Sequence, residues 1–165
     1  MHSPVRKSKD SSALTVRPMS TSDVAAAFSI LEESPEAALW SRASLQESAS
    51  HGTAWVAELD RRVVGILIGR VAADEFEILN LAVGQACRRR GIATQLLSAA
   101  FESARSAGAR QAFLEVRASN EGGIAFYMRM NFRICGCRPN YYRNPVENAV
   151  LLVLHDAGQN PEADP

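Results

Sequence analysis

Alternating apolar and polar positions in several short runs of the chain predict β-strands. Two of these runs, at residues 53–59 and 63–71, flank a tight turn at Asp60-Arg61, so they predict an antiparallel hairpin. The other predicted strands lie at residues 14–18, 75–83, 112–116, 132–137 and 149–154. The apolar runs at 63–71 and 78–83 are too short to cross a bilayer.

Elsewhere the apolar residues recur every three or four positions, which is typical of amphipathic helices. The clearest helix begins at Gly91 and ends at Ala107-Gly108, where glycine can adopt a left-handed conformation. A helix capped near Ser20 should reach about residue 33, and a second should follow Ser41. A short helix is expected at 121–130, closed by Asn131 at positive φ.

The predicted order of elements is β-α-α-β-β-β-α-β-α-β-β, an α/β architecture. A helix connects the strand at 75–83 to the strand at 112–116, so these two strands should be parallel. We expect one globular domain at residues 14–155, with disordered tails at 1–13 and 156–165.

Composition argues against several classes of function. The 165 residues include 18 Lys plus Arg and 18 Asp plus Glu, a balance that favours neither nucleic acid nor a membrane surface as partner. The first residues have no apolar segment typical of a secretory signal, so we expect a cytoplasmic protein. Three isolated histidines predict no metal site. Cys135 and Cys137 are expected on one side of a strand as buried small residues, without a disulfide framework.

A basic loop separates the strand at 75–83 from the helix that begins at Gly91. Free N–H groups at a helix start, with the positive end of the helix dipole behind them, bind anions. Arg88, Arg89 and Arg90 would add donors for phosphate. The single glycine fits neither the dinucleotide fingerprint nor the P-loop pattern. The loop therefore predicts a phosphate-bearing ligand of another kind.

The segment Arg88-x-x-Gly91-x-Ala93 resembles the pyrophosphate-binding motif of the GNAT superfamily of acetyl-CoA-dependent N-acetyltransferases. The run Leu114-Glu-Val-Arg-Ala-Ser-Asn120, followed by Ile124-Ala-x-Tyr127, is similar to the subfamily that acetylates the N-terminal alanine of a ribosomal protein. The resemblance extends from Trp40-Ser41 to the segment at 138–142 and covers residues 14–155.

The resemblance implies the GNAT fold, a mixed central sheet with a parallel, splayed strand pair flanked by helices. It also implies acetyl-CoA as co-substrate, no metal, and a protein N-terminus as acceptor, such as that of a ribosomal protein. The implied cofactor-binding residues are Leu81, Ala82, Val83, Arg88, Arg89, Arg90, Gly91, Ile92, Ala93, Thr94 and Asn120.

Three aromatic residues are expected on the acceptor side. Trp40 follows Leu39, which replaces the proline usual in the family and changes the expected shape of that loop. Tyr141 and Tyr142 would shape a peptide groove, or would be ordinary cross-strand aromatic residues.

Two residues are expected to move protons. Glu115 lies in a mostly apolar strand, where partial burial raises the pKa of a carboxylate toward the range useful for a base. The resemblance makes it the proton acceptor; the alternative is a structural carboxylate paired with Arg117 or with a loop arginine. The resemblance likewise makes Tyr127 the acid that protonates the coenzyme A thiolate. Its spacing alone fits a core tyrosine equally well.

Other functions remain open at this point. A GNAT enzyme could acetylate a small-molecule amine or an internal lysine, and a GNAT-like module could bind acyl-CoA without turnover. Glu115 and Tyr127 argue against a binding module, because such a module needs neither an acid nor a base. Three arginines without interleaved aromatic residues make nucleic-acid binding the weakest alternative.

Overall fold

The computed structural model describes residues 13–155, which form a mixed α/β fold with the predicted order of elements. The elements are β1 (Leu14–Pro18), the 3₁₀ turn η1 (Thr21–Asp23), α1 (Val24–Glu32), α2 (Arg42–Ser50), β2 (Ala54–Leu59), β3 (Arg62–Ala72), β4 (Glu75–Val83), the 3₁₀ turn η2 (Gln85–Cys87), α3 (Ile92–Ser106), β5 (Gln111–Arg117), α4 (Glu121–Arg129), β6 (Arg133–Arg143) and β7 (Val146–His155). Apart from Ala13, the predicted tails lie outside the described residues.

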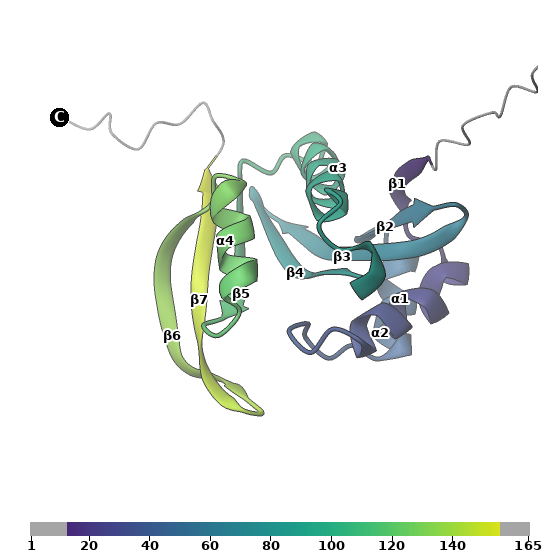
Figure 1. Ribbon diagram of the computed structural model, residues 1–165. Helices are drawn as coiled ribbons and strands as arrows, with labels where there is room; N and C mark the ends of the chain where they lie inside the picture. The colour runs from purple at the N-terminus through teal and green to yellow at the C-terminus, as the bar shows by residue number, and fades with distance from the viewer. Residues whose placement is uncertain (1–12, 156–165) are drawn as a thin grey trace, which may run out of the picture.

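A seven-stranded sheet in the order β1-β2-β3-β4-β5-β7-β6 organises the molecule. β4 and β5 are parallel, as predicted, and all other neighbouring strands are antiparallel. Figure 1 shows α1 and α2 on one face of β1–β4, α3 on the other, and α4 beside β5 and β7. The sheet is therefore mixed and flanked by helices, which confirms the predicted fold class.

The parallel pair is splayed. β4 and β5 pair only from Glu75 opposite Gln111 to Ile78 opposite Leu114. Beyond these residues β4 stays paired with β3 as far as Val83, and β5 stays paired with β7 as far as Arg117. The main-chain groups of residues 79–83 and 115–117 that face the gap therefore have no partner on the opposite strand. Figure 1 shows the two strands diverging.

A bulge in β4 lies where the strands diverge. Ile68 of β3 is opposite Asn80, whereas Gly69 is opposite Ile78, so Leu79 is the additional residue. Such a bulge changes which face the following side chains occupy. Asn80 is buried, and its Nδ2 donates to the carbonyl of Ala38 at 3.1 Å. The bulge thus gives β4 a polar contact with the segment that precedes α2.

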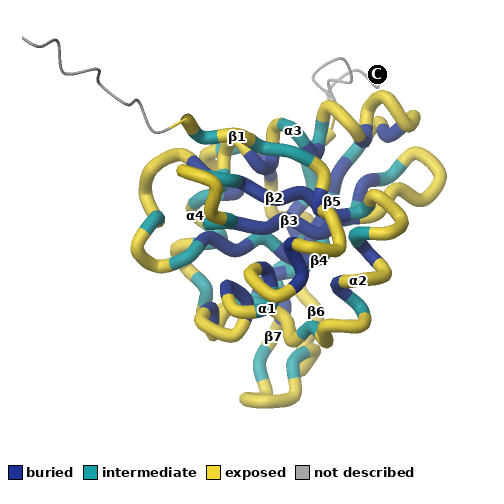
Figure 2. The backbone as a smooth tube through the Cα atoms, turned by 90° about the vertical axis from the view of Figure 1, so that its right-hand side faces the viewer, coloured by how far each residue is buried: buried dark blue, intermediate teal, exposed yellow. Residues whose placement is uncertain are grey.

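The sheet separates two apolar clusters. The larger one includes Leu67, Phe76 and Leu96 and lies on the side of α3 and α4. The smaller one includes Leu45 and Ile66 and lies on the side of α1 and α2. Figure 2 shows that the buried positions concentrate in the central strands. Helices cover both faces of β2–β4, so these buried strands hold the loop that follows β4 in a defined position.

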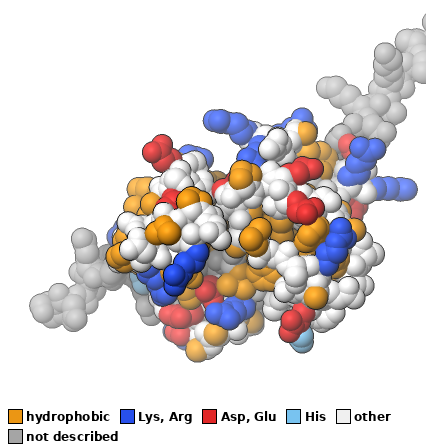
Figure 3. Space-filling model, turned by 90° about the horizontal axis from the view of Figure 1, so that it is seen from below, with side chains coloured by type: hydrophobic (Ala, Val, Ile, Leu, Met, Phe, Trp, Pro, Cys, Tyr) orange, Lys and Arg blue, Asp and Glu red, His pale blue; other side chains and the backbone are white. Residues whose placement is uncertain are grey.

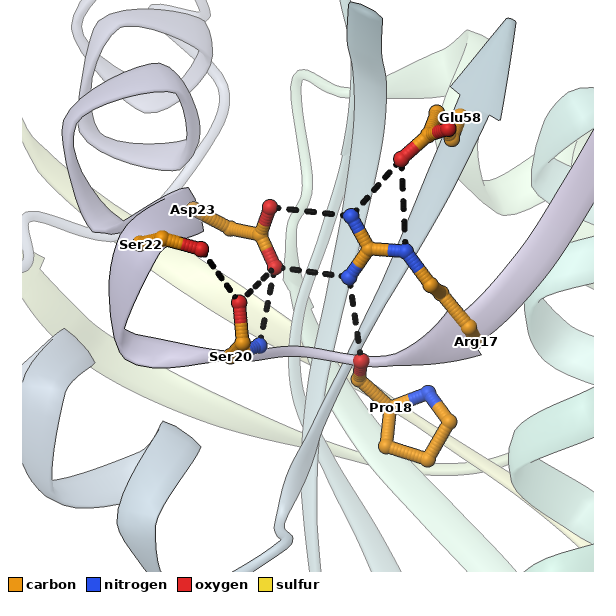
Figure 4. A network of polar contacts seen from close by, with 6 residues as sticks. All are labelled: Arg17, Pro18, Ser20, Ser22, Asp23 and Glu58. Carbon is orange, nitrogen blue, oxygen red and sulfur yellow. Dashed lines mark hydrogen bonds and ion pairs between the residues drawn. The ribbon is translucent and has the colours of Figure 1, made fainter. Parts of the chain in front are cut away.

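A polar network joins β1 to the start of α1 (Figure 4). Arg17 donates to both carboxylate oxygens of Asp23, at 2.7 and 3.0 Å, and to Glu58 of β2 at 2.7 Å. The backbone N–H and hydroxyl of Ser20 also donate to Asp23. These bonds, led by those from Arg17, lower the pKa of Asp23 to about 2. The helix start predicted near Ser20 is therefore fixed by an ionic network.

The last hairpin departs from the prediction in two ways. Its strands extend to Arg143 and from Val146, well beyond the predicted 132–137 and 149–154. Cys135 and Cys137 are exposed, so the expectation that they are buried is wrong. The register shifts between Ile134 and Gly136, which breaks the regular alternation on which that expectation depended. β6 is also the outermost strand and has no neighbour on one side.

Candidate active site

The loop that follows β4 leaves backbone N–H groups open at the start of α3, and we call residues 89–94 the anion cradle after the ligand predicted there. Arg89 and Gly91 both have positive φ, 61° and 76°, and Gly91 directly precedes α3. The backbone N–H groups of residues 89–94 have no hydrogen-bond partner among the described residues. A Cβ atom built at Gly91 would meet nothing within 4 Å, so the space before the helix is open. Unpaired N–H groups at a helix start suit a phosphate group.

The three arginines of this loop differ in what they contact. Arg89 and Arg90 are exposed and have no ion pair or hydrogen bond with another described residue. Arg88 instead donates to the carbonyl of Val83 at 3.0 Å and to Glu36 at 2.8 Å. The side chains available to an anion at this loop are therefore those of Arg89 and Arg90.

Residues that follow β5 lie at the same edge of the sheet, because the carboxyl ends of parallel strands point in one direction. Asn120 caps α4: its Oδ1 accepts the N–H of Gly123 at 2.9 Å. A Cβ at Gly123 would lie 2.6 Å from the Asn120 side chain, so the cap requires glycine there. Asn120 was predicted to bind the cofactor. The structure gives its side-chain oxygen a capping role and leaves its amide nitrogen free of partners in the described chain.

The three residues of β4 whose main chain was predicted to bind the cofactor border the gap between β4 and β5. Leu81 and Val83 pack toward the cluster beneath α3, and Ala82 packs toward α1 and α2. Their side chains are thus engaged in the two cores. What these residues present to the gap is main chain.

Glu115 lies on β5 in the splayed region, on the face opposite α4. Its carboxylate accepts from Nε of Arg138 on β6 at 3.0 Å, and its side chain is 15% exposed. Arg117 pairs instead with Glu147, at 3.2 Å. The structure shows neither of the two structural pairings considered for Glu115, because its partner Arg138 lies on a strand and not in a loop.

A bulge in β6 turns Tyr141 toward Glu115. Arg138 is opposite Ala149 and Tyr142 is opposite Glu147, so three residues of β6 face the single residue Asn148 of β7. The amide oxygen of Asn148 accepts the N–H of Asn140 at 3.0 Å, which fixes the bulge. Hydrogen bonding to Glu115 is the largest cause of the raised pKa of Tyr141. Bulges of this kind often re-aim a side chain beside an active site.

Tyr142 has a different environment. Its ring lies 4.2 Å from the guanidinium carbon of Arg117 and packs edge-on against Tyr141 at 5.1 Å between centroids. The Tyr142 ring therefore packs between Arg117 of β5 and the neighbouring tyrosine, whereas Tyr141 is 45% exposed.

Tyr127 lies on α4 within the larger core. It is 8% exposed, and its ring packs against Phe126 and Phe132 at centroid distances of 5.1 and 5.4 Å. Its hydroxyl has no hydrogen-bond partner in the described chain. Every fully buried side-chain nitrogen or oxygen among residues 13–155 does have a partner, so this hydroxyl is not fully buried. The hydroxyl must therefore reach accessible space. Burial raises the pKa of this phenol, so it keeps its proton at neutral pH.

The segment between α1 and α2 carries the predicted Trp40. Trp40 packs against the smaller core, and its neighbour Leu39 is fully exposed. No role was predicted from the sequence for the residues that hold this segment. Asn80 was the available signal, because it is a polar residue inside an otherwise apolar strand.

The charged residues near the site do not form a field of one sign. On the face drawn in Figure 3, acidic and basic side chains are interspersed among hydrophobic ones. Among residues 13–155, no three His, Cys, Asp or Glu side chains come together as they would around a metal ion. Within that same part of the chain, no helix is long and apolar enough to cross a membrane.

Comparison with known proteins adds to this geometry. A model of the acetyltransferase (GNAT) family matches residues 21–132. The [ribosomal protein bS18]-alanine N-acetyltransferase of Salmonella typhimurium is 31% identical over 145 residues, which cover 85% of this chain and 96% of that protein.

Two solved structures are similar over nearly their whole length. Ard1 from Thermoplasma volcanium has a TM-score of 0.80 and 27% identity, covering 87% of this chain and 98% of its own. The ribosomal-protein-S18-alanine N-acetyltransferase from Escherichia coli has a TM-score of 0.76 and 25% identity, covering 92% and 99%.

Proposed function

This chain belongs to the acetyltransferase (GNAT) family, and we propose that it transfers acetyl from acetyl-CoA to the N-terminal α-amine of a protein. The observation that carries the proposal is the splayed gap between β4 and β5, with Glu115 on its β5 side and the anion cradle following β4 at the same edge of the sheet. The 31% identity to a ribosomal-protein alanine acetyltransferase supports an α-amine acceptor. An acceptor on a ribosomal protein would place the reaction in the cytoplasm.

The residues present fit a coenzyme A ligand. The free N–H groups of residues 89–94 and the side chains of Arg89 and Arg90 would hold its pyrophosphate. The unpaired main chain of residues 81–83 would bind the extended arm, in the manner of a strand added to an open edge. Asn120 would contribute its amide nitrogen. Bound acetyl-CoA would supply the acetyl group as a thioester and depart as a thiolate.

Glu115 would accept the proton that the acceptor amine loses. A protein α-amine titrates near pH 8 and a lysine amine near 10.4, so the α-amine needs only a modest base. Arg138 holds the carboxylate in place at 3.0 Å, and the Tyr141 hydroxyl lies beside it. These partners would orient Glu115 and contact the incoming peptide.

Tyr127 would donate a proton to the departing thiolate. Burial keeps its hydroxyl protonated, and that hydroxyl is free of hydrogen-bond partners in the described chain. It could recover its proton from solvent, because it reaches accessible space. Glu115 and Tyr127 lie on opposite faces of β5, which suits one group that receives a proton and another that supplies one.

The acceptor is tested with short peptides that differ only in the first residue, such as Ala, Ser and Met. Each is incubated with acetyl-CoA and the purified protein, and mass spectrometry locates the label. The matched control is the same peptide with a blocked N-terminus and one internal lysine. Acetylation of the free N-terminus supports the proposal. Label found only on the lysine would replace it with a lysine acetyltransferase.

A further inference from the structure

The segment at residues 33–41 carries Leu39 and Trp40 and is tied to the region between β4 and the anion cradle. Three side chains make the connection. Asn80 donates to the carbonyl of Ala38 at 3.1 Å, Gln85 donates to the carbonyl of Glu33 at 3.4 Å, and Arg88 contacts Ser34 and Glu36. We call residues 33–41 the acceptor-side loop.

Arg88 has a special position among these contacts. Its Nε donates to the carbonyl of Val83, the last residue of β4, at 3.0 Å. One of its terminal nitrogens donates to the hydroxyl of Ser34 at 3.3 Å and to the carboxylate of Glu36 at 2.8 Å. Ser34 is itself buried and bonded to the carbonyl of Ile30. One guanidinium therefore joins the end of β4 to two residues of the acceptor-side loop.

The neighbouring residue, Arg89, has positive φ and forms part of the cradle. Arg88 is the residue before Arg89 in the chain. Movement of the cradle on binding an anion would consequently be transmitted to Arg88 through the backbone. From Arg88 it would pass to Glu36 through a 2.8 Å ion pair.

We propose that Arg88 is a positioning residue for the acceptor-side loop, not a phosphate ligand, and that it couples occupation of the cradle to acceptor binding. The inference rests on the proposed function, because it assigns the cradle to acetyl-CoA and the loop to the acceptor. Coupling of this kind is reciprocal, so each substrate improves the affinity for the other.

The test compares Arg88→Gln, Glu36→Gln and the double variant, with Arg89→Gln as matched control. Acetyl-CoA affinity is measured by calorimetry, and KM and kcat are measured for an accepted peptide. Each single variant should raise the peptide KM by about three- to fivefold, the range for a partly exposed ion pair. The peptide KM of the double variant should be no higher than that of Arg88→Gln alone, because both substitutions remove the same ion pair. Arg88→Gln and Glu36→Gln should change the acetyl-CoA Kd much less than Arg89→Gln, which removes a side chain of the cradle.

Two results would overturn the inference. One is an acetyl-CoA Kd raised as much by Arg88→Gln as by Arg89→Gln, with the peptide KM unchanged, because Arg88 would then be a phosphate ligand. The other is an additive effect of the two substitutions on KM. A purely structural role would lower the thermal midpoint and kcat together, without the selective change in KM.

Hydrogen exchange separates this inference from the proposed function. Amides of residues 33–41 should exchange faster in Arg88→Gln and Glu36→Gln than in the wild type. Addition of coenzyme A should slow their exchange in the wild type and in neither of these variants. If no peptide is acetylated but this pattern holds, the proposed function is wrong and the coupling stands. Equal exchange in all proteins, with or without coenzyme A, would refute the coupling.

Discussion

Replacing Tyr127 with phenylalanine separates the two roles that this buried side chain can have. The substitution keeps the ring, which packs against Phe126 and Phe132, and removes only the hydroxyl. That hydroxyl has no hydrogen-bond partner among the described residues, so its loss should change the free energy of unfolding by less than about 0.5 kcal/mol. By contrast, Tyr127→Ala removes the ring and should cost about 3–5 kcal/mol.

The expected effect on the reaction is much larger. Loss of a positioned acid typically lowers the rate about 10²–10⁴-fold. Because burial raises the pKa of Tyr127, the phenol keeps its proton above neutral pH, and its ionisation should cause no fall in wild-type kcat between about pH 6 and 9. Tyr127→Phe should lower kcat throughout this range and leave the acetyl-CoA Kd almost unchanged.

The assay follows thiol release from acetyl-CoA against pH, beside a thermal unfolding scan of the same protein. Near-normal kcat in Tyr127→Phe would remove the tyrosine from proton transfer and leave water as the proton source. A fall in thermal midpoint comparable with that of Tyr127→Ala would show instead that the hydroxyl serves the fold.

Three further predictions concern the base, the cradle and the network at β1. Glu115→Gln should lower kcat by about 10²-fold or more, with partial recovery as pH rises and the amine loses its own proton. Arg138→Gln, the control, should lower kcat less. Equal, pH-independent losses of kcat in the two variants, measured in the peptide assay, would contradict a base at Glu115. Gly91→Asp should weaken acetyl-CoA binding by about 2–4 kcal/mol more than the isosteric Gly91→Asn, because only the aspartate adds a negative charge beside the cradle. Equal acetyl-CoA affinities of the two variants by calorimetry would exclude phosphate binding at this loop. The pKa of Asp23 falls from 3.8 to about 2 on folding, so its ionic contacts contribute about 2 kcal/mol above pH 4, which is lost as pH falls through 2. In urea unfolding, Asp23→Asn should lower the free energy of unfolding by this amount at pH 7 and should make stability depend less on pH below 4. An unchanged urea midpoint at pH 7 would show that Glu58 alone is a sufficient partner for Arg17.

The sequence predicted the elements whose signals are local. The bounds of β4 were predicted to the residue, and the start of α3 at Gly91 followed from its apolar spacing and glycine. Asn131 has positive φ, as predicted from its place at the end of α4. Parallel pairing of β4 and β5 followed from the helix between them.

Features that depend on long-range pairing were not predictable in this way. The bulge opposite Asn148 interrupts the alternation of β6, so the strand signal ended before Arg138 although the strand continues to Arg143. The direction of the Arg88 side chain depends on Glu36, which lies 52 residues away in the chain. A local motif fixes the residue type at such a position but not what its side chain contacts.

The gap between β4 and β5 also has a consequence for the lifetime of the protein. Main-chain donors and acceptors that line it must be satisfied by water or by a ligand. A ligand that binds there binds only the folded chain, so it stabilises that chain by an amount that grows with the logarithm of its concentration. If acetyl-CoA is that ligand, resistance of the protein to heat and proteolysis would follow the supply of acetyl-CoA in the cell.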